Sequence, residues 1–172
     1  TLSPEQRASL RQTLDELKAQ ATALLQAEKV AEAFEIWYRE LRRRRALGYV
    51  EEVQALGRVG EVAWQRTLKP DTKIITQRLQ DIQQEAQKKK LMNLELQQAL
   101  GQAYRQVRLF EPAVGIYEKI LADAQTRSDA EAQETTLKTL AELNLAWFNY
   151  PKAAAAYEEL LARAQAKSDR IN

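Results

Sequence analysis

Two segments of this chain, 40 residues apart, carry nearly the same sequence. Residues 112–129 read PAVGIYEKILADAQTRSD, residues 152–169 read KAAAAYEELLARAQAKSD, and half of the positions are identical. Tyr117 and Tyr157 occupy the same place in the two copies, and so do Leu121 and Leu161. A unit of this length buries its apolar side by stacking on its neighbours, so the repetition predicts an array of stacked units.

The composition predicts that these units are helical. The chain of 172 residues has only 5 Gly and 4 Pro. Most of the remainder is Ala, Leu, Gln, Glu, Lys and Arg, which lose little on entering a helix. One short stretch, residues 73–76, has the Ile and Thr content of a strand. With 45% apolar residues, the chain is typical of a folded protein, and we expect a single all-α domain.

Start signals along the chain predict eight helices. Pro is tolerated in the first turn of a helix, where its missing N–H has no partner in any case. Near such starts the chain has Pro4, Pro70, Pro112 and Pro151. Ser3 and Ser128 each have Gln or Glu three residues later, which is the spacing of a capping box. We assign the helices in pairs to four units, at residues 4–47, 48–90, 91–127 and 128–167.

Three helix boundaries are less regular. The second helix of the second unit is expected to begin late, near Asp71. Between Lys88 and Asn93 there is no Gly or Pro, so both a break and one continuous bent helix remain open. Ser168 and Asp169 repeat the pair that opens the fourth unit. That repetition predicts the start of a fifth helix pair, as in a longer protein.

Residue types that most enzymes require are missing. The chain has no Cys and no His, which excludes thiolate zinc sites, cysteine nucleophiles and histidine general bases. Neighbouring carboxylates such as Glu51 and Glu52 diverge on a helix, whereas acid–base catalysis needs two that converge on one substrate. The sequence has no Gly-rich phosphate loop. We therefore expect no enzymatic activity, no cofactor and no metal site.

Charge and hydropathy narrow the class of partner. The 26 basic and 24 acidic residues give a net charge of +2, too small for the field that dominates nucleic-acid binding. A nucleic-acid partner is therefore disfavoured. No apolar run approaches the roughly 20 residues of a membrane-spanning helix. We expect a soluble cytoplasmic protein, although the chain starts without Met and a leader could have been removed.

The units resemble the tetratricopeptide repeat, a helix pair with a large residue, Leu-Gly and Tyr in its first helix and Ala and an aromatic in its second. The third unit matches at Leu100, Gly101, Tyr104, Phe110, Ala113, Tyr117 and Leu121. The fourth matches at Leu137, Leu140, Ala141, Tyr150, Ala153, Tyr157 and Leu161, and departs at Asn144, where the family prefers an aromatic. The first unit matches more loosely, at Leu17, Ala21, Leu24, Val30, Ala33, Trp37 and Leu41, and the second at Leu56, Gly57 and Gly60. The resemblance implies a right-handed α-α superhelical solenoid of four such repeats, with Tyr117 and Tyr157 buried.

The resemblance also implies a non-catalytic scaffold or assembly factor that binds a segment of a partner protein. First helices line the concave face of such an array. Mixed charges and amides at these positions suit an extended peptide or a helix. The expected binding residues are Lys18, Gln54, Arg58, Glu61, Glu95, Gln98, Gln102, Arg105, Lys138 and Glu142. Some family members clamp a C-terminal carboxylate with Lys and Asn. The matching positions here carry Lys18 but then Thr22, Ala55, Glu95 and Ala99, so that mode is not expected.

A basic run offers one alternative function. Arg39, Arg42 and Arg43 fall on one helix face and would form a patch for phosphate groups. Lys88, Lys89 and Lys90 form a second basic run. Cations at the end of a helix are also favourable without any ligand, because they interact with the helix dipole. We prefer this structural interpretation to a nucleic-acid-binding repeat.

The aromatic residues and the C-terminal end leave two further questions. If they were exposed, Trp37, Trp64, Trp147 and Phe148 could stack on nucleic-acid bases, but their helical spacing is more typical of core positions. The C-terminal end could stack on another copy of the chain, which would make the protein a homo-oligomer.

Overall fold

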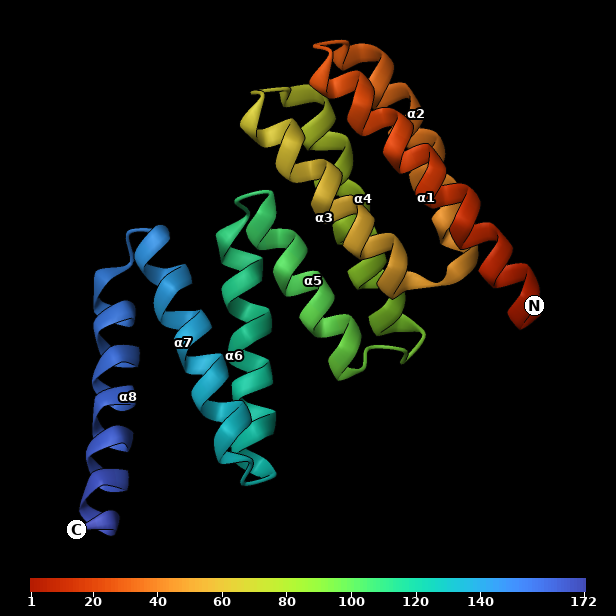
Figure 1. Ribbon diagram of the computed structural model, residues 1–172. Coiled ribbons are helices and arrows are strands. Elements are labelled where there is room, and N and C mark those ends of the chain that lie inside the picture. The colour runs from red at the N-terminus through yellow and green to blue at the C-terminus, as the bar shows by residue number, and fades with distance from the viewer.

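The computed structural model describes all 172 residues, and all of its regular secondary structure is helical (Figure 1). A short 3-10 turn at Arg45–Leu47 links the second helix to the third, and residues 73–76 lie inside a helix. The expectation of an all-α protein is confirmed. The eight α-helices are α1 (Pro4–Gln26), α2 (Val30–Arg44), α3 (Tyr49–Gln65), α4 (Lys69–Lys88), α5 (Leu94–Gln106), α6 (Phe110–Thr126), α7 (Ala130–Ala146) and α8 (Tyr150–Ile171).

Side-chain caps begin four of these helices. At α1, Ser3 and Gln6 form the expected capping box: the Gln6 N–H donates to Ser3 Oγ over 3.1 Å and the Ser3 N–H to Gln6 Oε1 over 2.8 Å. At α7 the expected box is wrong. Ser128 is a turn residue with φ of 55°, and Asp129 caps the helix by accepting a backbone N–H over 3.0 Å. The caps of α5 and α8 are Asn93 and Asn149.

Six helices end in one kind of turn without using glycine. At the first of them, the Glu28 N–H donates to the Leu25 carbonyl and the Lys29 N–H to the Leu24 carbonyl, both over 2.9 Å. This Schellman pattern satisfies the last carbonyls of a helix. It also ends α4, so the break after Lys88 requires neither Gly nor Pro. The left-handed residues of the six turns, with φ of 55° to 61°, are Glu28, Thr67, Lys90, Arg108, Ser128 and Phe148.

Two expected boundaries are wrong. α4 begins at Lys69, before Asp71, because Pro70 is accommodated within its first turn. Ser168 and Asp169 do not begin a helix, since they lie inside α8, which continues to Ile171. A Ser-Asp pair begins a helix only where a turn precedes it, and no turn interrupts α8.

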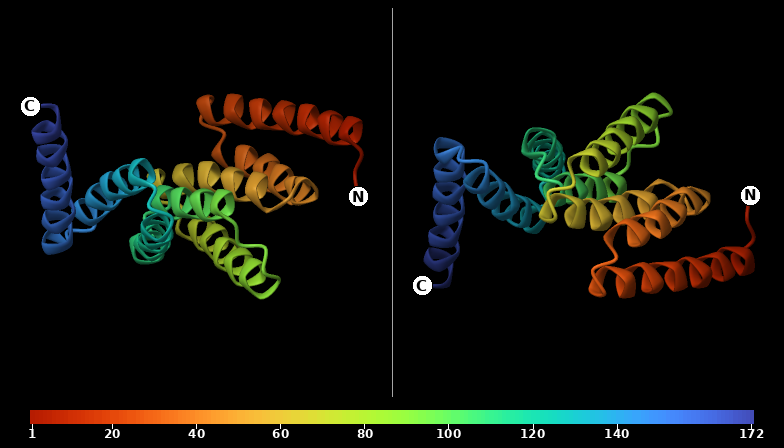
Figure 2. Two further views of the ribbon diagram at one scale, coloured as in Figure 1. Left: turned by 90° about the horizontal axis from the view of Figure 1, so that it is seen from below. Right: turned by 90° about the horizontal axis from the view of Figure 1, so that it is seen from above.

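The helices form a row of hairpins that twists along its length. Each helix lies beside its successor (Figure 1), and α1 and α8 stand at opposite ends with their axes at a steep angle (Figure 2). α3 and α5 approach closely at Gly57, where an added Cβ would lie 3.0 Å from Ala103 Cα. This approach lets one hydrophobic core run from Ala21 on α1 to Leu143 on α7.

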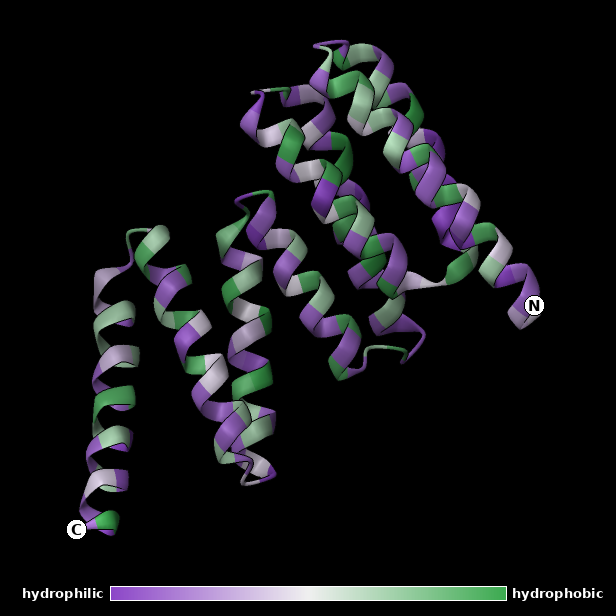
Figure 3. Cartoon of the chain, in the orientation of Figure 1, coloured by the Kyte–Doolittle hydropathy of each residue, from purple (hydrophilic) through white to green (hydrophobic).

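The last two hairpins differ in how deeply their second helices are buried. On α6, Tyr117 packs onto Gly101, where an added Cβ would lie 2.8 Å from its ring, and Leu121 packs against α7. On α8 the equivalent residues Tyr157 and Leu161 are 46% and 59% exposed, because only α7 packs along α8. The expectation that Tyr157 is buried is therefore wrong. Hydrophobic segments recur along α8 at the outer edge of the molecule (Figure 3).

Candidate partner-binding surface

A polar hollow of about 530 Å³ brings first helices of successive hairpins together. It extends from α1 across α3 to α5 and includes the last residue of α2. Four of the expected binding residues line this one hollow. Those four are Lys18, Gln54, Arg58 and Glu95, and the remaining lining residues are Asp15, Arg44, Val50, Glu51 and Ala55.

Buried Glu40 holds two guanidinium groups at the hollow. Its Oε2 accepts a hydrogen bond from Arg58 over 2.6 Å and another from Arg44, which also pairs with Asp15 over 3.2 Å. Burial lowers the pKa of Arg58, although the attraction of Glu40 opposes the shift. A guanidinium paired in this way loses little further freedom when it binds a ligand. The hollow therefore presents cations with fixed positions.

Three lining residues of the hollow keep free polar groups. Lys18, Gln54 and Glu95 are exposed and form no side-chain hydrogen bond or ion pair. An amide, an ammonium and a carboxylate together can donate to and accept from a peptide backbone or polar side chains. The sequence predicted these three positions, but it did not indicate that Arg44 would join them.

The other six expected residues lie outside this hollow. Gln98 lines a second, smaller depression of about 270 Å³ between α5 and α7. Arg105 and Glu142 pair with each other over 3.0 Å, and Lys138 pairs with Glu134 over 3.7 Å. Glu61 accepts a 3.5 Å hydrogen bond from Gln106, and Gln102 is exposed without a partner. The structure thus brings four expected residues of the N-terminal part together in one hollow. In the C-terminal part, Arg105, Lys138 and Glu142 form ion pairs on the surface.

The arginine run is divided between internal pairing and solvent. Arg44 pairs with buried Glu40, and Arg45 pairs with buried Glu52 over 3.1 Å. Glu52 is also held by Arg78 over 2.7 Å. The spacing of Glu40 and Arg44, four residues apart on a helix, is the signal for this pairing in the sequence. The candidate basic patch, Arg39, Arg42 and Arg43, is exposed and forms no ion pair.

The aromatic residues do not all belong to the core. Trp37 is buried and packs edge-on against Phe34, with ring centres 5.1 Å apart. Trp64, Trp147 and Phe148 are exposed, so the core interpretation is wrong for these three. Trp147 and Phe148 lie at the turn between α7 and α8, and Trp64 lies at the end of α3, where fewer helices cover them.

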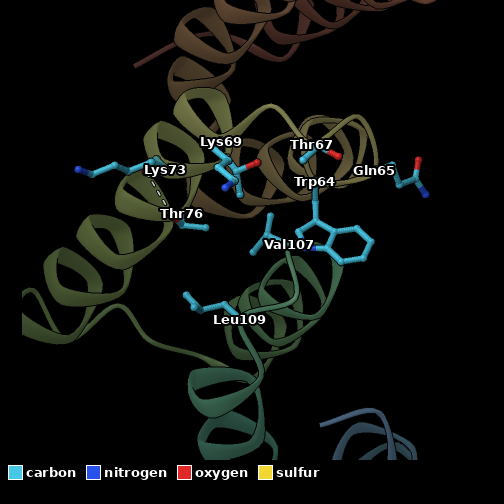
Figure 4. A pocket seen from close by; sticks show the side chains of 9 residues that line it. Trp64, Gln65, Thr67, Lys69, Lys73, Thr76, Val107 and Leu109 are labelled. Carbon is cyan, nitrogen blue, oxygen red and sulfur yellow. Dashed lines mark hydrogen bonds between the residues drawn. The ribbon is translucent and has the colours of Figure 1, made fainter.

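Trp64 belongs to a second hollow, of about 580 Å³, on another part of the surface. Figure 4 shows the indole ring beside Val107, with Leu109 below and Lys69 and Lys73 projecting from α4. The Arg108 guanidinium lies 4.9 Å from the centre of the Trp64 ring. Sequence reasoning did not identify this hollow, because its walls come from a helix end, a helix start and a turn.

No three acidic side chains converge anywhere in the chain as metal ligands would. Crossing a membrane would require a longer or more apolar helix than any that the protein contains. No protein-family model matches the chain, and no curated protein was found to match it.

Proposed function

We propose that the chain is a tetratricopeptide-like solenoid that acts as a non-catalytic scaffold and binds a segment of a partner protein across its first helices. The observation that carries this proposal is the hollow shared by Lys18, Gln54, Arg58 and Glu95. These residues come from three helices, and Lys18 and Glu95 are 77 residues apart in the sequence, yet all four line one cavity. Its volume is within the range of about 300–1,000 Å³ typical of ligand sites.

The chemistry of the hollow indicates the kind of segment that it binds. Both cations and anions line it, and its lining also includes the aliphatic side chains of Val50 and Ala55. A polypeptide carries donors and acceptors at regular spacing and can pair with both. A nucleic acid needs a continuous basic surface instead, and Asp15, Glu51 and Glu95 would repel its phosphates.

Affinity capture with matched variants tests the proposal. The immobilised chain is compared with a triple variant, Lys18→Ala, Gln54→Ala and Glu95→Ala, which removes the three free groups of the hollow. A control variant, Glu35→Ala, Gln80→Ala and Lys88→Ala, removes the same three residue types from exposed positions on second helices. We expect the proteins captured by the wild type to be retained by the control and lost by the hollow variant.

The salt dependence of capture separates this proposal from nucleic-acid binding. A peptide held in a partly enclosed hollow survives moderate salt, whereas phosphate contacts weaken steeply as counterions compete. Equal capture by the two triple variants would contradict the proposed face. Capture of nucleic acid alone, and only at low salt, would move the function to Arg39, Arg42 and Arg43.

Self-association through α8 is a second candidate, favoured by its exposed apolar stripe. Successive residues turn by about 100° around a helix, so Tyr150, Tyr157 and Leu161 lie on one side of α8, with Ala154 and Ala164. At the other end of the array, α1 exposes no large apolar side chain. Two copies would therefore pair α8 with α8, with the apolar stripe of one copy packed against that of the other.

Sedimentation velocity over a range of concentrations tests this pairing. The wild type should dimerise with increasing concentration, and the double variant Tyr157→Ser and Leu161→Ser should remain a monomer. Ile74→Ser with Leu91→Ser is the control, because both side chains are more than half exposed and lie on or beside α4. A wild type that stays monomeric throughout would eliminate the α8 dimer without affecting the proposed peptide face.

A further inference from the structure

The hollow at Trp64 has an apolar floor. Trp64, at the end of α3, is 45% exposed, and it lies with Val107 and Leu109 of the turn that joins α5 to α6. Its ring is contacted by the Arg108 guanidinium at 4.9 Å. Tryptophan is among the residues that contribute most to binding at protein interfaces. An indole left half-exposed in a hollow is therefore suited to contact an apolar group of a ligand.

The charged lining of this hollow is entirely positive. Lys69 and Lys73 line it from the first two turns of α4, and no acidic residue lines it. Neither lysine forms an ion pair or a side-chain hydrogen bond, and the same is true of Arg108. The single acid in the first turn of α4, Asp71, accepts a hydrogen bond from Tyr38. The hollow therefore has positive charge that the protein itself does not neutralise.

The remaining polar groups of the lining are partly used within the protein. The Thr72 and Thr76 hydroxyls donate to the backbone carbonyls of Leu68 and Lys73, over 2.9 Å and 3.1 Å. In Figure 4 Lys69 and Lys73 both project from α4, across from Trp64, and the Lys73 side chain extends away from the indole ring. Two cations one helical turn apart on α4 can pair with acidic groups that flank an apolar residue in contact with the indole.

We propose that this hollow binds a short acidic peptide segment, in which one bulky apolar side chain contacts Trp64, Val107 and Leu109. Carboxylates beside that side chain pair with Lys69 and Lys73. The positive end of the α4 dipole adds to the attraction. A nucleic acid fits less well. A protein that binds its backbone needs a row of cations that spans several nucleotides, and only two lysines line the hollow. This site shares no residue with the hollow on the first helices, so it is a separate binding surface.

Fluorescence anisotropy with labelled peptides tests the proposal on the intact chain. The probe is a seven-residue peptide of three Asp or Glu on each side of a Phe, and a second peptide replaces Phe with Ser. We expect saturable binding of the Phe peptide that weakens as salt is added, and at least tenfold weaker binding of the Ser peptide. Equal binding of both peptides would overturn the role of the apolar floor.

A charge-reversal pair tests the role of the lysines. Lys69→Glu with Lys73→Glu should weaken binding of the Phe peptide by at least tenfold. Lys29→Glu with Lys88→Glu makes the same change in net charge at two exposed lysines that form no ion pair, and it should leave binding within about twofold. Helical content of both variants is checked by circular dichroism. Equal losses in the two variants would overturn the site, because they would show general charge attraction.

A single-stranded oligonucleotide of thymidines is the competing probe. Binding of this oligonucleotide, with no binding of the Phe peptide at low salt, would overturn the proposal in favour of a nucleic-acid site. Absence of peptide binding in every arm would also overturn it. Neither result bears on the first-helix hollow, since the triple variants that test that hollow leave Lys69 and Lys73 unchanged.

Discussion

Residues 112–129 and 152–169, which cover most of α6 and α8, are identical at half of their aligned positions, yet the two helices have different environments. α6 lies between α5 and α7, and its Tyr117 and Leu121 are at least partly covered by those neighbours. α8 packs along α7 only, and the same two residue types, Tyr157 and Leu161, face outward. The difference shows that in a repeat the burial of a residue depends on the neighbouring unit as well as on its own sequence.

The largest effect expected from this comparison is on stability at the two tyrosines. Tyr117→Ala removes a ring that packs onto Gly101, and we expect a loss of about 3 kcal/mol in the free energy of unfolding. Tyr157→Ala removes a half-exposed ring and should cost about 1 kcal/mol or less, since less apolar area is lost. Urea unfolding of both variants measures the difference. Similar losses would mean that α8 is covered in solution.

A smaller effect is expected at the contact between α5 and α6. Gly101→Ala places a Cβ 2.8 Å from the Tyr117 ring, and we expect overpacking to cost about 2 kcal/mol. Gly115→Ala is the matched control on α6, because its added Cβ would meet no atom within 4 Å. It should stabilise the protein by about 0.5–1 kcal/mol through helix propensity. Thermal unfolding distinguishes the opposite signs, and a stabilising Gly101→Ala would show that the ring is not packed there.

The smallest effect concerns the residue at which the fourth unit departs from the third. Asn144 stands where the third unit has Tyr104, whose hydroxyl donates to Gln83 over 2.6 Å. Asn144 is buried and donates to the Leu140 carbonyl over 2.9 Å, but its side-chain oxygen has no partner. We expect Asn144→Leu to stabilise the protein by about 1 kcal/mol, because an unsatisfied buried acceptor is removed. A destabilised variant in a thermal melt would indicate that the amide has a partner in solution.

The helices could be predicted from sequence because their signals are local. Pro70 and Pro151 lie in the first turns of α4 and α8, and Ser3 caps α1. Each of these residues affects only the turn of backbone in which it lies, so its effect can be predicted from the sequence nearby. The Schellman turns were less predictable, because Glu28 and Lys90 adopt a left-handed conformation that glycine usually takes. Their stability comes from the hydrogen bonds that they complete, and residue type alone does not indicate those.

The candidate surfaces were only partly predictable, because they depend on packing between helices. The resemblance to the tetratricopeptide repeat implied that Lys18, Gln54 and Glu95 lie on one face of the first helices, and these residues line the same hollow. The same reasoning gave no sign that Glu40 would be buried and would hold Arg58. It also assigned Trp64 to the core, because spacing along one helix cannot show that a neighbouring helix stops short of it.

The central claim is that a partner lies along the first helices, and site-specific photo-crosslinking tests it most directly. A photoreactive phenylalanine analogue replaces Gln54 in the hollow or, as the control, Gln80 on α4, which is also an exposed Gln. The account predicts a crosslinked protein of defined mass from position 54 and none from position 80. The same crosslinked protein from both positions, or from position 80 alone, would contradict it.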